Sequence, residues 1–237
     1  MICIPIVGPS MSKAQEQIES ALVIADILEL SLDLIVPPDL SALLASSTLP
    51  VIVTNRSKHD GGQYKGLDED RLQSLRDALK AGADYVDIEV STPREYLQPF
   101  LEESEPAKII LSYHDFSHTP EDLNPVYETM CEMPGEIVKI VTYARDLSDN
   151  LKMFELLKRA KSEKQKLIGL CMGDLGETSR ILSPLFGGYL TLAVSKQGRK
   201  ALRVRFLQKY SKIFIGSTPS VLILKFMESL ATRYQKV

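Results

Sequence analysis

Short runs of β-branched and other apolar residues alternate along the chain with segments whose apolar positions recur at helical spacing. Most of these runs lack strict alternation of apolar and polar positions, which is typical of strands that are covered on both faces. The strands that the pattern predicts are Ile2–Val7, Leu28–Val36, Pro50–Asn55, Ala83–Val90, Lys108–Tyr113, Ile137–Ala144, Lys166–Met172 and Tyr189–Ser195.

Start and stop signals mark the helices between these strands. A helix over Asp68–Lys80 ends before Gly82, and Thr92 and Thr119 each precede a proline and acidic residues in the spacing of a capping box. We therefore expect one helix to begin after Thr92 and another after Thr119. The remaining predicted helices are Ser12–Val23, Pro38–Ala45, Leu147–Ala160 and Gly176–Leu185.

Eight strands that alternate with seven or eight helices in 237 residues favour a (β/α)₈ TIM barrel, built as a single domain over residues 1–237. The alternative is an open doubly wound sheet. Eight regular units without a break in composition favour the closed barrel over this alternative. The segment 196–237 is atypical, because a basic stretch, the apolar run Ile213–Ile215 and an apolar helix Ser220–Tyr234 follow Ser195. The position of the eighth strand therefore stays open.

Composition places the chain among soluble globular proteins, with 44% hydrophobic and 25% charged residues. No apolar run is long enough for a membrane helix, and the first ten residues lack the pattern of a signal peptide. The three cysteines are far apart in the sequence, which fits neither a disulfide framework nor a metal cluster and indicates a reducing cytoplasm. A net charge of −3 argues against nucleic acid as a partner.

Basic residues gather in one part of the chain, since no Asp or Glu occurs between Glu177 and Glu228. A solvated helix face from Lys196 to Lys212 is the simpler interpretation of this stretch. The alternative is an electropositive rim that attracts a small anion.

Lys139 is the most informative polar residue, because it lies in the middle of an apolar strand where lysine is rare. Burial would lower the pKa of its amine, and a neutral amine can attack a ketone to form a Schiff base. Two structural alternatives remain open: the side chain extends outward along the barrel surface, or it forms an ion pair with a barrel acid.

His114 directly follows the fifth predicted strand and precedes Lys139 by 25 residues, which is one repeat of the barrel. The two residues should therefore lie on neighbouring strands, and neighbouring strands are about 4.8 Å apart. Histidine is suited to proton transfer near neutral pH, although a loop histidine that caps the next helix is the alternative.

Acidic residues recur at other strand ends. Glu29 and Asp33 share one face of the second strand with Ser31, and Asp87 and Glu89 share one face of the fourth. These acids could pair with a lysine in a polar barrel interior, and for Asp33 and Asp87 purely structural ion pairing is an equal alternative.

Two loops could hold an anionic substrate. Arg180 follows the glycine-containing turn Gly173–Gly176, a geometry that favours anions, and a guanidinium there could bind a carboxylate with two hydrogen bonds. Arg56 ends the third strand and is followed by the loop Lys58–Gly62, which can close over a site.

Four segments in order resemble those of type I 3-dehydroquinate dehydratase, an enzyme of the shikimate pathway. The resemblance covers about residues 2–195, at strand ends one repeat apart. The segments are Asn55–Ser57 with Asp60–Gly62, Ser112–Phe116, Ile137–Ile140, and Met172–Gly176 with Ser179 and Arg180.

The resemblance implies that Lys139 forms a Schiff base with the ketone of 3-dehydroquinate and that His114 acts as general acid and base. Loss of water would then give 3-dehydroshikimate, with no metal and no organic cofactor. The substrate-binding residues that the resemblance implies are Glu29, Arg56, Asp60 and Arg180, with Arg180 on the substrate carboxylate.

The chain departs from the family pattern at three places. Ser31 stands where the family's E-x-R-x-D strand has arginine, and Asp60 stands where a glutamate is usual. The S-A-P-G-Q motif expected after the eighth strand is absent from 193–202. Two alternatives therefore stay open: another Schiff-base lyase or aldolase, and a degenerate barrel that binds the ligand with little or no turnover. The oligomeric state is not fixed, and a homodimer is left open.

Overall fold

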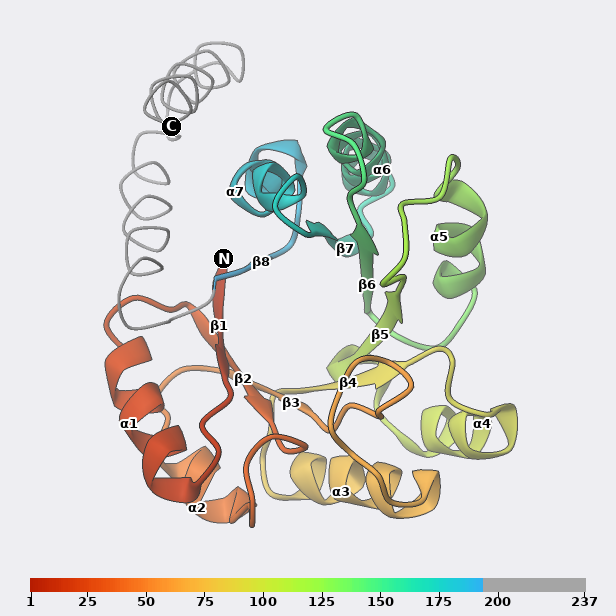
Figure 1. Cartoon of the computed structure of the whole chain (residues 1–237). Coiled ribbons are helices and arrows are strands. Elements are labelled where there is room, and N and C mark those ends of the chain that lie inside the picture. Colours follow the sequence, from red (N-terminus) through yellow and green to blue (C-terminus); the bar gives the residue numbers. More distant parts are fainter. Residues whose placement is uncertain (194–237) are drawn as a thin grey trace. The chain divides into compact units, whose positions relative to one another are not determined.

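The structure, a computed structural model, describes residues 1–193 and contains one sheet of eight parallel strands inside a ring of helices (Figure 1). The sheet order is β7-β6-β5-β4-β3-β2-β1-β8, so each strand neighbours the next in sequence and β8 returns to β1. Tyr189 N, just before β8, donates to Leu167 O of β7 at 2.8 Å, so the two ends of the sheet meet. The predicted (β/α)₈ barrel is confirmed, and the doubly wound sheet is excluded.

All eight predicted strands are present, most of them within a few residues of the predicted bounds. The strands are β1 (Ile2–Ile6), β2 (Ile27–Ser31), β3 (Val51–Thr54), β4 (Tyr85–Glu89), β5 (Ile109–His114), β6 (Ile137–Tyr143), β7 (Lys166–Met172) and β8 (Thr191–Leu192). The prediction was wrong at the end of the second strand, where the chain turns after Ser31 because Leu34 N bonds to Ser31 O and Ile35 N to Leu32 O.

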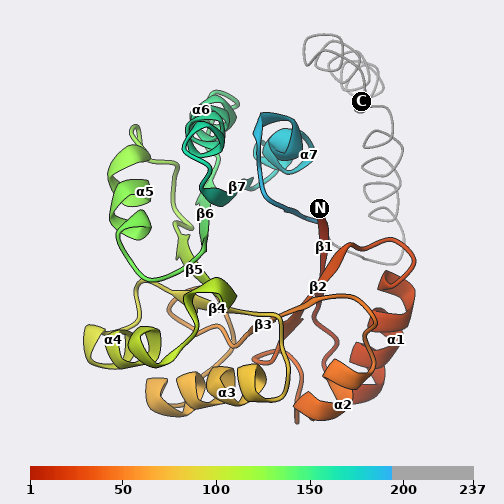
Figure 2. The same ribbon diagram turned by 180° about the vertical axis from the view of Figure 1, so that it is seen from behind.

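Seven α-helices and one short 3₁₀ helix lie between the strands of the described chain, outside the sheet in both views (Figure 2). They are α1 (Met11–Ala21), α2 (Leu40–Ala45), α3 (Asp68–Lys80), α4 (Arg94–Glu103), η1 (Pro106–Lys108), α5 (Asn124–Cys131), α6 (Asp149–Ser162) and α7 (Glu177–Phe186). The prediction for α3 matches the structure at both ends.

Neither expected capping box forms. Helix α4 does begin just after Thr92, but the Thr92 hydroxyl accepts a hydrogen bond from the Arg71 guanidinium instead of capping the helix. The helix expected after Thr119 starts only at Asn124, because the Thr119 hydroxyl is paired with Thr142 Oγ1 at 2.8 Å and donates to a backbone carbonyl. Tertiary partners have therefore taken the hydroxyls that the local pattern assigned to the helix ends.

The interior of the barrel has an apolar floor and a polar layer above it. The floor is a cluster of buried side chains, and each isoleucine or leucine in it contributes about 1.5–3 kcal/mol by leaving water. It consists of Cys3, Ile27, Ile52, Ile110, Ile137, Ile168, Leu170 and Leu190. Side chains alternate along a strand, so the residue two positions after a floor residue points into the same interior one layer higher. Glu29, Ser112 and Lys139 follow Ile27, Ile110 and Ile137 in this way.

The chain divides into two units, Met1–Ser195 and Lys196–Val237. The predicted basic segment Lys196–Lys212 and the runs Ile213–Ile215 and Ser220–Tyr234 lie outside the described residues, so the single domain over 1–237 stays a prediction. Within residues 1–193, none of the helices has the length and apolarity that crossing a membrane requires.

Candidate active site

Lys139 lies in the middle of β6 and points into the barrel, with only 4% of its surface exposed. Its ammonium nitrogen Nζ donates to Glu29 Oε1 at 2.8 Å and to Asp87 Oδ2 at 2.6 Å. These carboxylates come from β2 and β4, so three strands place their charged groups at one point in the interior. Of the alternatives that the sequence left open, the outward-pointing lysine is excluded and the ion pair is confirmed.

The expectation of a neutral Lys139 amine is wrong for this state of the protein. Burial alone would lower the lysine pKa, but the charges of Asp87 and Glu29 outweigh burial and raise it. The same contact acts on the acid: burial opposes the charge of Asp87, but Lys139 and Arg56 hold the pKa of its carboxyl well below the usual range. Lys139 is therefore an ammonium between two carboxylates.

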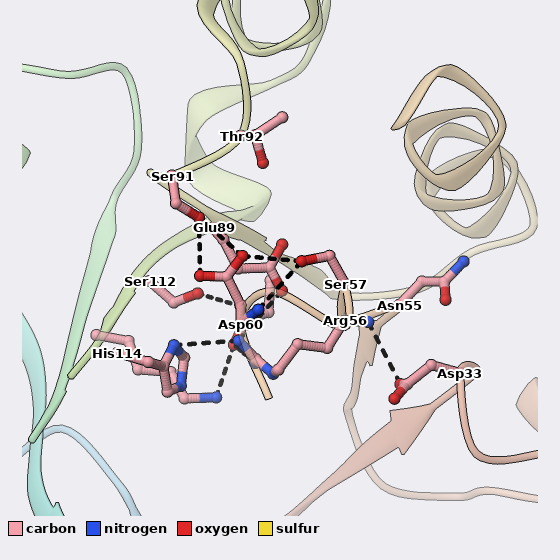
Figure 3. Close-up of polar contacts among 12 residues, drawn as sticks. Asp33, Asn55, Arg56, Ser57, Asp60, Glu89, Ser91, Thr92, Ser112 and His114 are labelled. Atoms are coloured by element: carbon pink, nitrogen blue, oxygen red, sulfur yellow. Dashed lines mark hydrogen bonds and ion pairs between the residues drawn. The ribbon is translucent and has the colours of Figure 1, made fainter. Parts of the chain in front are cut away.

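Arg56 follows β3 and connects the acids to the histidine (Figure 3). Its Nη2 lies 3.3 Å from Asp87 Oδ2, and its Nη1 lies 3.1 Å from Glu89 Oε1 and 3.1 Å from His114 Nδ1. A guanidinium can only donate hydrogen bonds, so the lone pair of His114 Nδ1 accepts and the neutral ring carries its proton on Nε2. This tautomer follows from the contact with Arg56.

The predicted placement of His114 beside Lys139 is confirmed. Strands β5 and β6 are paired, with Ser112 opposite Lys139 and His114 opposite Val141. Burial, together with the positive charges of Arg56 and Lys139, lowers the His114 pKa well below 6.5. The imidazole is therefore neutral at neutral pH, as a general base must be.

Behind these groups lies Arg71 of α3, which was not among the site residues predicted from the sequence. It is 1% exposed and donates to Glu89 Oε2 at 2.6 Å, to Thr92 Oγ1 at 2.8 Å and to Asp68 Oδ1 at 2.8 Å. Burial, with repulsion from Asp87, still raises the Glu89 pKa despite both arginines. The signal that could have identified Arg71 is its position on the face of α3 that is otherwise filled by buried apolar residues.

Ser112 was also missed as a site residue, and it holds the second oxygen of Asp87. Its hydroxyl donates to Asp87 Oδ1 at 2.6 Å, and the side chain is fully buried. Side chains alternate along β5, so Ser112 lies on the same face as His114. This alternation was the sequence signal that could have identified Ser112 as a site residue.

Asp60 lies in the loop between β3 and α3 and fastens that loop to the next one. Its carboxylate accepts from Ser57 Oγ at 2.9 Å and from Ser91 Oγ at 2.8 Å (Figure 3). Asp33, in the turn that follows β2, holds the same loop by accepting from the backbone N–H groups of Arg56 at 3.3 Å and Gln63 at 2.9 Å. Both acids thus order the loop that carries Arg56.

Phe116 joins this loop to the histidine. Its ring stacks on His114 with centroids 5.9 Å apart, and the tip of the same ring lies against Gly61. Gly61 has φ of +80°, and a Cβ added there would overlap the Phe116 ring. A glycine is needed at this position both for its backbone conformation and for its lack of a side chain.

Arg180 lies in the first part of α7 and is partly buried. The loop that connects β7 to α7 is on the same side of the barrel as the ends of β3 and β5, because all strands are parallel. The backbone carbonyl of Arg180 accepts a hydrogen bond from Thr191 Oγ1 of β8 at 2.5 Å, and this bond anchors the first part of α7.

The buried charges balance, with the cations Lys139, Arg56 and Arg71 facing the anions Glu29, Asp87 and Glu89. Across residues 1–193, no three His, Cys, Asp or Glu side chains are grouped as a metal site would require. The arrangement joins a potential nucleophile, proton acceptors and a neutral imidazole, and these are the groups that covalent catalysis on a carbonyl compound uses.

Comparison with known proteins identifies the family of the chain. The family model for type I 3-dehydroquinase matches residues 2–211. A 3-dehydroquinate dehydratase of Desulfotalea psychrophila is 36% identical over 197 residues, covering 80% of this chain and 85% of the relative. One of Methanococcus maripaludis is 36% identical over 203 residues, covering 84% and 91%. The solved type I 3-dehydroquinate dehydratase of Clostridium difficile superposes with a TM-score of 0.78 at 21% identity, covering 90% of this chain and 93% of the other.

Proposed function

The chain belongs to the type I 3-dehydroquinase family, and we propose that it converts 3-dehydroquinate into 3-dehydroshikimate through a Schiff base on Lys139. The observation that carries this proposal is the buried Lys139, held by two carboxylates on a strand next to that of a neutral His114. The names of the relatives support the substrate, and the geometry supports the type of chemistry.

In the proposed reaction the Lys139 nitrogen attacks the ketone carbon, and the carbonyl oxygen leaves as water. The resulting iminium withdraws electrons, so the neighbouring C–H bond becomes acidic and His114 removes its proton. The electron pair of that bond then expels the hydroxyl group on the next carbon, which His114 protonates as it departs. Hydrolysis of the conjugated iminium releases 3-dehydroshikimate and restores Lys139.

His114 needs a free lone pair to act as a base, and in this state Arg56 occupies the lone pair of Nδ1. We propose that the bound substrate draws Arg56 away by accepting its hydrogen bonds. In this scheme Glu29, Arg56, Asp60 and Arg180 form the substrate-binding set, with Arg180 on the carboxylate and Asp60 acting through the loop that carries Arg56.

Borohydride trapping tests the covalent step. Reduction in the presence of 3-dehydroquinate should add one substrate-derived mass to Lys139, and the conjugated product should absorb in the ultraviolet when reductant is omitted. Lys139→Ala should lose both signals, whereas Lys13→Ala, which removes an exposed lysine paired with Glu16, should keep them. Turnover without an adduct on Lys139 would refute the Schiff base.

The same assay separates the two alternatives. The replacement of an expected arginine by Ser31, which is buried with 8% exposure, favours a binder with little turnover. Such a protein would bind 3-dehydroquinate without forming the absorbing product. A Schiff-base aldolase would give a Lys139 adduct with sugar-phosphate aldehydes and none with 3-dehydroquinate.

A further inference from the structure

The two carboxylates that contact Lys139 have different surroundings. Asp87 accepts hydrogen bonds at both oxygens: Oδ1 from Ser112 at 2.6 Å, and Oδ2 from Lys139 at 2.6 Å and Arg56 at 3.3 Å. Glu29 accepts only from Lys139, at 2.8 Å, among the hydrogen bonds of residues 1–193, although its side chain is just 7% exposed. One carboxylate is held in its charged form by three donors, and the other by Lys139 alone.

This difference matters because Lys139 must lose a proton before it can attack a ketone. Its nitrogen is buried, so bulk water has poor access to it, and the proton must pass to a group already within hydrogen-bond distance. Glu29 and Asp87 are the two groups at that distance in the described chain. The inference rests on the function proposed above, and it concerns which of the two carboxylates takes the proton of Lys139.

We propose that Glu29 is the proton acceptor that converts the Lys139 ammonium into a nucleophilic amine, while Asp87 stays ionised as the counter-ion of the iminium. The positions of the two acids support this division, since two carboxylates in different environments commonly take separate acid and base roles. Protonating Asp87 would break its contact with Arg56 or Lys139, whereas protonating Glu29 breaks no other hydrogen bond.

The competing proton acceptors are less suitable. Lys139 and Arg56 hold the Asp87 pKa well below its usual range in spite of burial, so this carboxylate binds a proton poorly. The hydrogen bond of His114 in the described structure goes to Arg56, at the nitrogen that would otherwise accept a proton. Glu29 remains as the acceptor in direct contact with the ammonium.

Every charged or titratable group around Glu29 is compatible with the transfer. Lys139 on β6 is the donor, Arg56 after β3 is a permanent cation, and Asp87 on β4 is the permanent anion. Cys3 on β1 also faces Glu29, but burial raises its thiol pKa and keeps it neutral. Moving one proton from Lys139 to Glu29 leaves the net charge of the site unchanged, so the transfer requires no counter-ion from outside.

The steps from the Lys139 ammonium to the iminium balance in atoms and protons without another reagent. The ammonium gives one proton to Glu29, and the amine attacks the carbonyl carbon to form a carbinolamine after a second nitrogen proton moves to the oxygen. Glu29 then returns its proton to that hydroxyl, which leaves as water. The iminium retains the third proton and the positive charge, next to Asp87.

The test is the rate at which the iminium forms, measured on the full chain mixed with 3-dehydroquinate and quenched with borohydride at successive times across a range of pH. Glu29→Gln keeps the size of the side chain but cannot accept a proton. It should slow adduct formation by about 100-fold to 10,000-fold, the usual contribution of a general base. The remaining rate should rise with pH, because hydroxide must then remove the proton. The matched control is Glu19→Gln, the same change at an exposed position of α1.

Two further variants separate a chemical role from a structural one. Asp87→Asn retains the acceptor, so the iminium should still form without the new pH dependence but should reach a lower level at equilibrium. Glu29→Asp, a carboxylate one methylene shorter, should be slower than the unmodified chain without gaining the pH dependence of Glu29→Gln.

The outcomes also distinguish this inference from the proposed function. No adduct on Lys139 of the unmodified chain would remove the dehydratase mechanism itself. A normal adduct there, together with either an unchanged rate in Glu29→Gln or a slow rate that does not respond to pH, would overturn the role of Glu29 alone.

Discussion

Arg71 offers the sharpest test of how the site is supported, because its guanidinium is buried and contacts no group that we propose to react. Arg71→Met replaces it with an apolar side chain of similar length. The change removes the donors to Glu89 Oε2, Thr92 Oγ1 and Asp68 Oδ1. Glu89 is 1% exposed, so its second oxygen is left in a place that water does not reach.

The size of the effect follows from this burial. Removing one partner of a buried ion pair typically costs about 3–5 kcal/mol, because the remaining charge stays desolvated. For a domain of this size, 1 kcal/mol shifts the melting temperature by about 2–4 °C, so we expect Arg71→Met to melt about 6–20 °C lower. Thermal unfolding followed by circular dichroism measures the shift.

Arg76→Met is the control on the same helix. Arg76 pairs with Glu103 at 3.1 Å and lies over the Phe100 ring, but it is 24% exposed and its partner 65% exposed. An exposed pair contributes about 0–1 kcal/mol, so this variant should melt close to the unmodified chain. Equal shifts in Arg71→Met and Arg76→Met would refute the argument from burial.

The pH dependence of the stability loss in Arg71→Met gives an independent check on this explanation. Burial already raises the Glu89 pKa, and removing the positive charge of Arg71 raises it further. A carboxyl whose pKa is raised on folding destabilises the folded state once it ionises, so protonation in acid relieves the charge that Arg71 no longer balances. The deficit of Arg71→Met should therefore shrink as the pH falls, and adding Glu89→Gln should recover part of the lost stability at neutral pH. A deficit that grows in acid would contradict this account.

Two further predictions concern the histidine and its loop. Nuclear magnetic resonance titration should give His114 a pKa well below 6.5, since burial, Arg56 and Lys139 all lower it. Arg56→Met should raise that pKa, and an unchanged value would show that Arg56 does not contribute. Gly61→Ala should lower kcat/KM because its Cβ would push Phe116 from its stack on His114, whereas Gly82→Ala, with φ of +101° and nothing within 4 Å of a Cβ, should cost only the backbone strain of about 1–2 kcal/mol. Equal kcat/KM values in the two alanine variants would exclude the stacking role.

The sequence predicts the barrel well because strand order in this fold follows chain order. The 25-residue spacing of His114 and Lys139 therefore places them on paired strands, as the register shows. The second strand was predicted too long, and the helix after Thr119 too early, because local patterns do not reveal which tertiary partner a hydroxyl or a turn will find.

The charge on Lys139 could not be predicted in the same way. The two acids that decide it are 110 and 52 residues away in the sequence, and their reach into the barrel depends on how the ring closes. Arg71 was missed for a related reason: a single cation on an amphipathic helix does not indicate whether it faces solvent or a buried acid.

The energies of burial and of charge pairing explain why the lysine is charged and why one proton can still leave it. At an effective dielectric constant of about 20, a carboxylate 2.8 Å from an ammonium attracts it by about 6 kcal/mol. Desolvation of a buried ion costs several kcal/mol, so one carboxylate nearly offsets burial and two exceed it. When Glu29 takes the proton, it removes one of these attractions and the charge of Lys139 together, and Asp87 retains Arg56 as its partner. The nucleophile is therefore made available by moving a proton over one hydrogen bond, and a low lysine pKa in the resting protein is not required.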